Sequence, residues 1–145
     1  MKNEQNISRP VFNLKNLYFI IALIAFNLVY SVSFAQQAPW VSPKSSNIVK
    51  NPLAGNKSVL AAGKTLYVAN CAPCHGEKGK GDGPASAALN PKPADHSSAR
   101  VQSETDGSLF YKLSAGRSPM PSYSKILTDQ QRWELINYIR TLAKK

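Results

Sequence analysis

The sequence predicts a small all-α protein, and three observations support this prediction. Apolar residues recur at helical spacing near residues 58–70, 106–115 and 128–143, and no segment alternates as a half-buried strand would. Glycine and proline gather between these segments, where turns and loops are expected. With 145 residues the chain has room for one domain. We therefore expect about four helices around a single core.

The first 35 residues have the pattern of an export signal. Three cations precede an apolar run over residues 17–29, and small residues follow at positions 33 and 35, which is the order of regions in a signal peptide. A helix on the surface of a small domain would need a polar face, which this run lacks. An uncleaved membrane anchor over residues 17–34 is the alternative. We expect residues 1–35 to direct export to the periplasm, and we favour cleavage because the run is short for a membrane span.

The chain is basic, with 18 Lys and Arg against 8 Asp and Glu and a formal net charge of +10. Without residues 1–35 it keeps 15 of these cations and 7 of the acids, a net charge of +8. The cations are scattered, and no helix or ribbon with a nucleic-acid motif gathers them, so we expect no nucleic-acid partner. A basic surface on an exported protein favours an acidic protein partner, and a merely solvated surface is the alternative.

Residues 36–57 are rich in Pro, Ser and Asn and show no apolar period. This composition predicts an extended linker or a strap lying over the domain. Trp40 is its one large apolar side chain, and we expect it to dock on the domain or on a partner. The folded domain should then occupy residues 58–145.

The first helix of this domain should begin at Ser58, a candidate N-cap, and end at the cysteines at positions 71 and 74. Gly63 lies in its middle, where it costs about 1 kcal/mol relative to alanine. A second helix crossing closely over Gly63 would explain this glycine.

The middle of the domain is rich in helix breakers. Residues 76–83 contain too many glycines for a helix or strand and should form a loop. A short helix over residues 84–89 is possible because Pro84 can occupy a first turn. Residues 90–104, interrupted by prolines, should be irregular.

Two further helices complete the prediction. Asp106 can cap a helix that ends at Gly116. Thr128 and Gln131 form a capping box for the last helix, whose apolar stripe should pack against the Gly63 helix.

The strongest motif in the chain is Cys71-Ala72-Pro73-Cys74-His75. Two thiols separated by two residues can add to the two vinyl groups of a haem, and the adjacent imidazole then lies over the iron. The motif predicts one covalently bound haem c, with thioethers at Cys71 and Cys74 and with His75 as the proximal iron ligand. A dithiol redox pair would be expected near a βαβ pattern, and a zinc site would need about four ligands, so both alternatives are weaker.

Haem iron needs a sixth ligand or an open face, and Met120 is the expected distal ligand. It lies between Pro119 and Pro121, which restrict the backbone and keep the side chain out of a helical core. A Met/His pair is a known set of axial ligands. A gap-filling methionine would need a core position. His96, in a polar stretch, is expected to be solvated or locally hydrogen-bonded.

Several groups of residues form one pattern: Gly63-Lys64-x-Leu66-Tyr67, Cys71-x-x-Cys74-His75-Gly76, Gly79-x-Gly81-Asp82-Gly83, Pro119-Met120-Pro121, and a closing helix with Trp133, Ile136 and Tyr138. The combination resembles the bacterial class I monohaem cytochromes c over residues 58–145. The resemblance implies a small cytochrome c fold, with about four helices wrapped around one covalently bound haem c. It implies that the first and last helices cross at Gly63, with Tyr67 against Tyr138. It also implies that a proline carbonyl accepts the other N–H of His75, a role open to Pro91 and to Pro93.

These features predict electron transfer rather than catalysis. With His75 and Met120 in both axial positions, the protein should carry electrons between respiratory or dehydrogenase partners with acidic docking surfaces. The alternative is a dedicated cytochrome c subunit of a larger exported dehydrogenase or respiratory complex, with the segment around Trp40 as a docking strap. A haem enzyme or gas sensor with open iron would need a displaceable or absent distal ligand. We expect a membrane contact only through an uncleaved N-terminal segment or a membrane complex.

Overall fold

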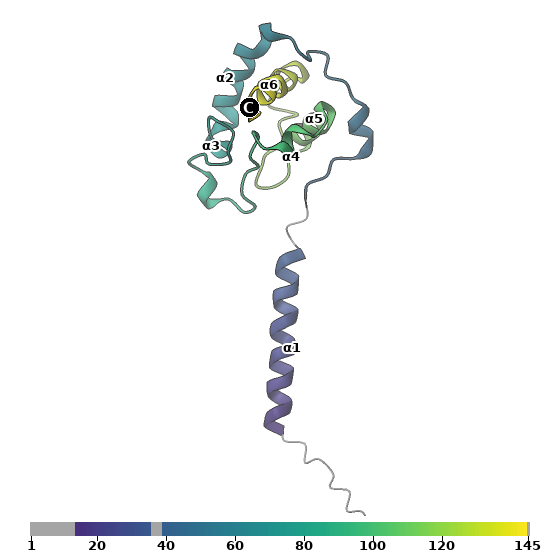
Figure 1. Ribbon diagram of the computed structural model, residues 1–145, viewed down its shortest axis with the longest axis vertical. Helices are drawn as coiled ribbons and strands as arrows, with labels where there is room; N and C mark the ends of the chain where they lie inside the picture. Colours follow the sequence, from purple (N-terminus) through teal and green to yellow (C-terminus); the bar gives the residue numbers. More distant parts are fainter. Residues whose placement is uncertain (1–13, 36–38, 145) are drawn as a thin grey trace, which may run out of the picture. The chain divides into compact units, whose positions relative to one another are not determined.

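The computed structural model describes residues 14–35 and 39–144 (Figure 1). The chain divides after Pro39 into two compact units. The first contains helix α1 (Leu14–Ala35). Within the described ranges, no helix is both long enough and apolar enough to cross a membrane. Residues 1–13, which begin the predicted export signal, lie outside the described residues, and export stays a prediction.

The second unit is built from short helices and loops. Its elements, in chain order, are the 3₁₀ turns η1 (Lys44–Ile48) and η2 (Lys57–Val59), α2 (Leu60–Asn70), α3 (Ala72–His75), the 3₁₀ turn η3 (Ser86–Ala88), α4 (Ala99–Gln102), α5 (Asp106–Ala115) and α6 (Asp129–Thr141). Between residues 39 and 144 the sole β-type pairing is an isolated bridge between Arg117 and Met120. The predicted all-α fold is confirmed.

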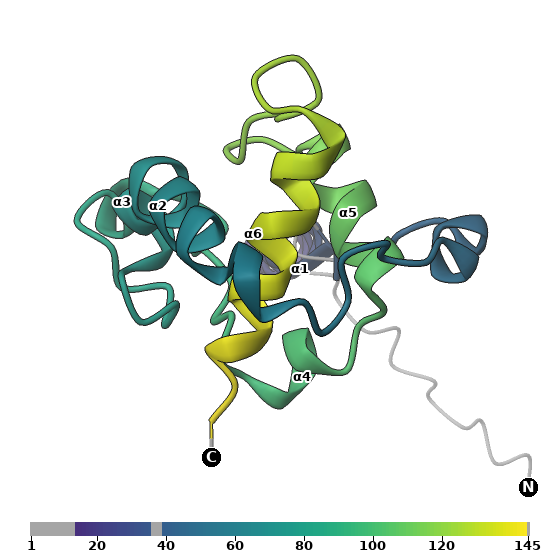
Figure 2. The same cartoon turned by 90° about the horizontal axis from the view of Figure 1, so that it is seen from above.

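Helix α6 packs against both α2 and α5 (Figure 2). At its crossing with α2, a Cβ on Gly63 would clash with the carbonyl oxygen of Glu134. Next to this contact Tyr67 is fully buried, and its ring centroid lies 5.2 Å from that of Tyr138. The glycine in α2 therefore allows the close approach of α6, and the predicted crossing is confirmed.

Two helix boundaries match the sequence prediction. The capping box of α6 is present, with Gln131 N–H donating to Thr128 Oγ1 at 3.2 Å and Thr128 N–H donating to Gln131 Oε1 at 2.9 Å. Helix α5 ends at Gly116, whose φ of 65° is a conformation that favours glycine.

Two predicted N-caps are wrong. Asn56, rather than Ser58, caps the start of the first helical segment, because its Oδ1 accepts the Ser58 N–H at 2.9 Å and opens η2 before α2. Thr105, rather than Asp106, caps α5 through a 3.1 Å bond from Ser108 N–H. Asp106 is instead the first residue of the helix, and its carboxylate binds Arg140 Nε at 2.8 Å.

The middle segment also differs in detail. Only the turn η3 forms where a short helix was predicted over residues 84–89. The predicted irregular segment 90–104 contains one helical turn, α4, because the Ser98 side chain accepts the Val101 N–H. Val101 is buried in the core by this turn.

Residues 40–56 form a strap over α5. Ser42 Oγ donates to Ser108 Oγ at 2.8 Å, and Asn51 Nδ2 donates to Asp106 at 2.8 Å and to Asn137 at 3.0 Å. The Trp40 ring lies 5.2 Å from the Arg117 guanidinium and 5.8 Å from Lys112 Nζ. Trp40 thus docks on its own domain, and the compact unit begins at this residue rather than at Ser58.

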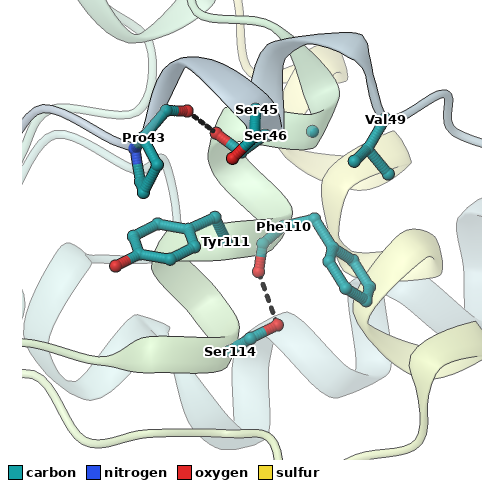
Figure 3. Close-up of a pocket in the computed structure, with 8 residues that line it drawn as sticks. Pro43, Ser45, Ser46, Val49, Phe110, Tyr111 and Ser114 are labelled. Atoms are coloured by element: carbon teal, nitrogen blue, oxygen red, sulfur yellow. Dashed lines mark hydrogen bonds between the residues drawn. The ribbon is translucent and has the colours of Figure 1, made fainter.

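The strap and α5 line an open pocket of about 320 Å³ (Figure 3). It is lined by Pro43, Ser45, Ser46, Val49, Gly107, Phe110, Tyr111 and Ser114. None of the residues predicted to bind haem lines it.

Candidate functional site

The attachment motif forms a single helical turn that continues α2. Cys71 N–H donates to Tyr67 O at 2.8 Å, and His75 N–H donates to Cys71 O at 2.8 Å. Both cysteines are free thiols, Cys71 buried and Cys74 half-buried. Burial, and then the neighbouring Cys74, raises the pKa of Cys71 to about 12. The turn therefore presents two sulfurs beside one imidazole, and the sulfur of Cys71 is kept as an uncharged thiol.

A hydrogen bond of the His75 ring determines its tautomer. Its Nδ1 lies 2.9 Å from the carbonyl oxygen of Ala94, which can only accept, so Nδ1 carries the proton. Burial lowers the pKa of His75, against the opposing effect of the Ala94 bond. The neutral ring keeps the Nε2 lone pair available for a metal.

The predicted partner of His75 was a proline carbonyl, and the structure corrects this prediction. Neither Pro91 nor Pro93 supplies the acceptor, because the carbonyl of the next residue, Ala94, does. The Pro93 carbonyl lies against Gly81, at a place where a Cβ would clash with it, and Gly81 has a φ of 77°. The glycine-rich loop thus packs closely against the Pro93 carbonyl, and His75 bonds to the Ala94 carbonyl.

His96 was predicted to be solvated or locally hydrogen-bonded, and it is half-buried and hydrogen-bonded in the structure. Its ring stacks on that of His75, with centroids 4.0 Å apart and an interplanar angle of 17°, and its Nδ1 lies 3.1 Å from the Tyr67 hydroxyl. Burial, and then His75, lowers the pKa of His96 to about 3. The polar residues around His96 in the sequence gave no sign that its ring stacks on His75.

Met120 lies in the loop between α5 and α6. Its N–H donates to Arg117 O at 2.9 Å, and its carbonyl accepts the Arg117 N–H at 3.0 Å, which closes a tight turn around Pro119. The side chain is half-buried and packs against the core that includes Cys71.

Tyr123 ties this loop to the attachment turn. Its hydroxyl donates to the carbonyl of Asn70, the residue before Cys71, at 2.8 Å, and its N–H donates to Leu113 O at 3.0 Å. Burial, and then the two cysteines, raises the pKa of Tyr123 to about 12. Sequence reasoning missed this residue, because nothing local in the sequence relates Tyr123 to Asn70.

The structure does not support the two alternative roles of the motif, a dithiol redox site and a zinc site. A dithiol redox site would be expected beside a βαβ unit, yet residues 39–144 form no strand. Within the described residues, no group of three or more His, Cys, Asp and Glu side chains could hold a metal ion. A four-ligand zinc site therefore has no candidate there.

The fold and the site together define a haem-binding class, and comparison with known proteins gives its family. The family model of cytochrome c matches residues 60–143, so this chain belongs to the cytochrome c family. The family carries covalently bound haem c, and one haem suits this small domain. The residues fit the group, since one turn holds two free thiols and a neutral imidazole with Nε2 available.

A solved structure gives a second comparison. A chain of the reducing HAO-like protein complex of Kuenenia stuttgartiensis is similar to this chain, with 28% sequence identity and a TM-score of 0.59. The similarity covers 76% of this chain and 54% of that chain. The present protein thus spans about half the length of that relative.

Proposed function

We propose that this protein transfers electrons in the periplasm through one haem c whose axial ligands are His75 and Met120. The observation that carries the proposal is the arrangement around the attachment turn. The Ala94 carbonyl keeps Nε2 of His75 free, and Tyr123 holds the Met120 loop to Asn70, beside Cys71. Both ligand-bearing segments are therefore fixed in the folded chain.

Haem, when bound, supplies an iron that accepts and donates one electron. The residues of this chain would attach the group at Cys71 and Cys74, orient His75 and present a thioether at Met120. A thioether ligand favours reduced iron and raises the potential. Because Met120 lies in a turn closed by two backbone hydrogen bonds, little rearrangement should accompany a change of oxidation state.

Visible spectra of the reduced, exported protein with and without carbon monoxide test the ligand assignment. The wild-type spectrum should not change, because both axial positions are filled. Met120→Leu should open one position and give a rapid shift with carbon monoxide. Ile126→Ala is the matched control, since this side chain of the same loop is 60% exposed. A wild-type protein that binds carbon monoxide rapidly would contradict Met120 ligation.

A free carrier and a complex subunit remain two versions of this function. Similarity to a chain from an HAO-like protein complex favours a dedicated subunit. The basic composition favours brief encounters with acidic redox proteins. Sedimentation of the protein purified at low salt from its own cells distinguishes them, because a subunit should sediment with its partner and a carrier as a monomer.

A further inference from the structure

The backbone and side chain of His96 are held at three places. Its N–H donates to Gly79 O at 2.6 Å, its carbonyl accepts Gln102 Nε2 at 2.7 Å, and its Nδ1 lies 3.1 Å from Tyr67 Oη. A Cβ on Gly79 would lie 3.0 Å from the Cβ of His96 and 3.3 Å from Tyr67 Oη. The His96 ring therefore sits in a closely packed site with little freedom to turn.

The direction of the Tyr67 contact follows from counting protons. The Tyr67 hydroxyl donates to the carbonyl of Gly76 at 3.2 Å, and this uses its single proton. His96 Nδ1 must then be the donor to Tyr67 Oη. The chain from His96 through Tyr67 to Gly76 ends on the residue that follows His75. His96 is thus anchored to the same turn as the proximal imidazole.

The stack between the two histidine rings constrains a motion that the Ala94 bond leaves open. The Nδ1–H bond of His75 at 2.9 Å sets the direction of this nitrogen, yet the ring can still tilt about that bond. A nearly parallel ring at 4.0 Å blocks tilting on one side, because the two faces are already in van der Waals contact.

We propose that His96 is a positioning residue for the proximal ligand. Its ring, tied to Tyr67 and stacked on His75, sets the plane of the His75 imidazole and so the orientation in which this ligand meets iron. The inference rests on the proposed function, because it requires His75 to bind iron. It adds a residue that neither the attachment motif nor the axial pair contains.

Proton NMR of the oxidised haem-loaded protein tests the proposal, because the shifts of the haem methyl groups depend on the orientations of the axial ligands, and His96 contacts only the His75 side. His96→Leu removes the stacked ring and should reorder these resonances. His96→Phe retains a flat ring and should keep the wild-type order. Tyr67→Phe removes the anchor but leaves both histidines, so a smaller change in the same direction is expected.

Phe110→Leu is the matched control for losing a stacked ring. Phe110 stacks on Trp133 with the same 4.0 Å centroid distance and an angle of 18°, in a contact between α5 and α6. This variant should lower stability and leave the haem methyl order unchanged.

Three outcomes would overturn the inference. An unchanged methyl order in His96→Leu is the first. Equal changes in His96→Leu and His96→Phe are the second, because the ring would then not matter. If His96→Leu fails to load haem, unchanged methyl shifts in Tyr67→Phe are the third. A failure of the proposed function is distinguishable, because the wild-type protein itself would then lack the spectrum of His/Met-ligated iron.

Discussion

The two sides of the proposed haem site are held by different means. On the proximal side, Cys71, Cys74 and His75 share one helical turn, and backbone bonds within that turn place them. On the distal side, Met120 lies in a loop that returns to the same turn through Tyr123, a residue 53 positions away from its partner Asn70. The comparison indicates that contacts between sequence neighbours position the proximal side, whereas a contact between distant residues positions the distal side.

The proximal side nevertheless also has contacts with residues that are distant in the sequence. The Ala94 carbonyl and the His96 ring reach His75 from a segment about 20 residues away, held against the glycine-rich loop by the contact of Pro93 with Gly81. Substitutions can therefore test three features separately. These are the covalent attachment of haem, the contacts that position His75 (proximal support) and the contacts that position the Met120 loop (distal support).

The largest expected effect is on attachment. Replacing both Cys71 and Cys74 by serine should abolish covalent haem, because no thiol remains to form a thioether. Haem staining of the protein on a denaturing gel measures this outcome. The single variant Cys74→Ser should retain one thioether and part of the staining, and full staining of the double variant would refute the attachment prediction.

Proximal support should give the next largest effect. Gly81→Ala places a Cβ against the Pro93 carbonyl, so it should lower the free energy of unfolding by about 1–3 kcal/mol more than Gly55→Ala. Gly55 is a suitable control, because its φ of 73° is similar and no atom lies within 4 Å of a Cβ there. Denaturant unfolding of both haem-loaded variants makes the comparison, and equal losses would show that the Pro93 contact is unimportant.

Distal support should give a smaller effect on stability. Tyr123→Phe removes the hydrogen bond to Asn70 O and should cost about 1 kcal/mol. It should also speed the binding of carbon monoxide, because the Met120 loop loses its tie to the attachment turn. Tyr111→Phe is the control, since Tyr111 is 36% exposed. If carbon monoxide binds both variants equally slowly, Tyr123 does not hold the loop.

The strap should have the smallest effect. Trp40→Ala removes the ring beside Arg117 and Lys112 and should cost about 0.5–1 kcal/mol, the range of an exposed cation–π contact. Val41→Ala, at a side chain that is 78% exposed, is the control. Thermal unfolding compares the two variants, and a loss of several kcal/mol for Trp40→Ala would mean that the strap is part of the core.

Sequence patterns predicted the parts of this fold that depend on neighbouring residues. The capping box at Thr128, the stop at Gly116 and the Cys71–His75 turn are each encoded within a few positions, and the structure has all three. The crossing at Gly63 was also predictable, because a glycine in a helix signals close approach. The errors at Ser58 and Asp106 arose where a second polar residue one or two positions earlier, Asn56 or Thr105, could also cap the helical segment.

The sequence by itself thus determined an all-α fold, a strap or linker before it, and the attachment motif, because helical periodicity, caps and motif spacing are local properties. Only the tertiary structure decided which carbonyl binds His75, where His96 lies and what ties the Met120 loop to the attachment turn. These contacts join residues that are far apart in the chain. Their partners depend on how loops of irregular backbone pack, and no sequence period records that packing.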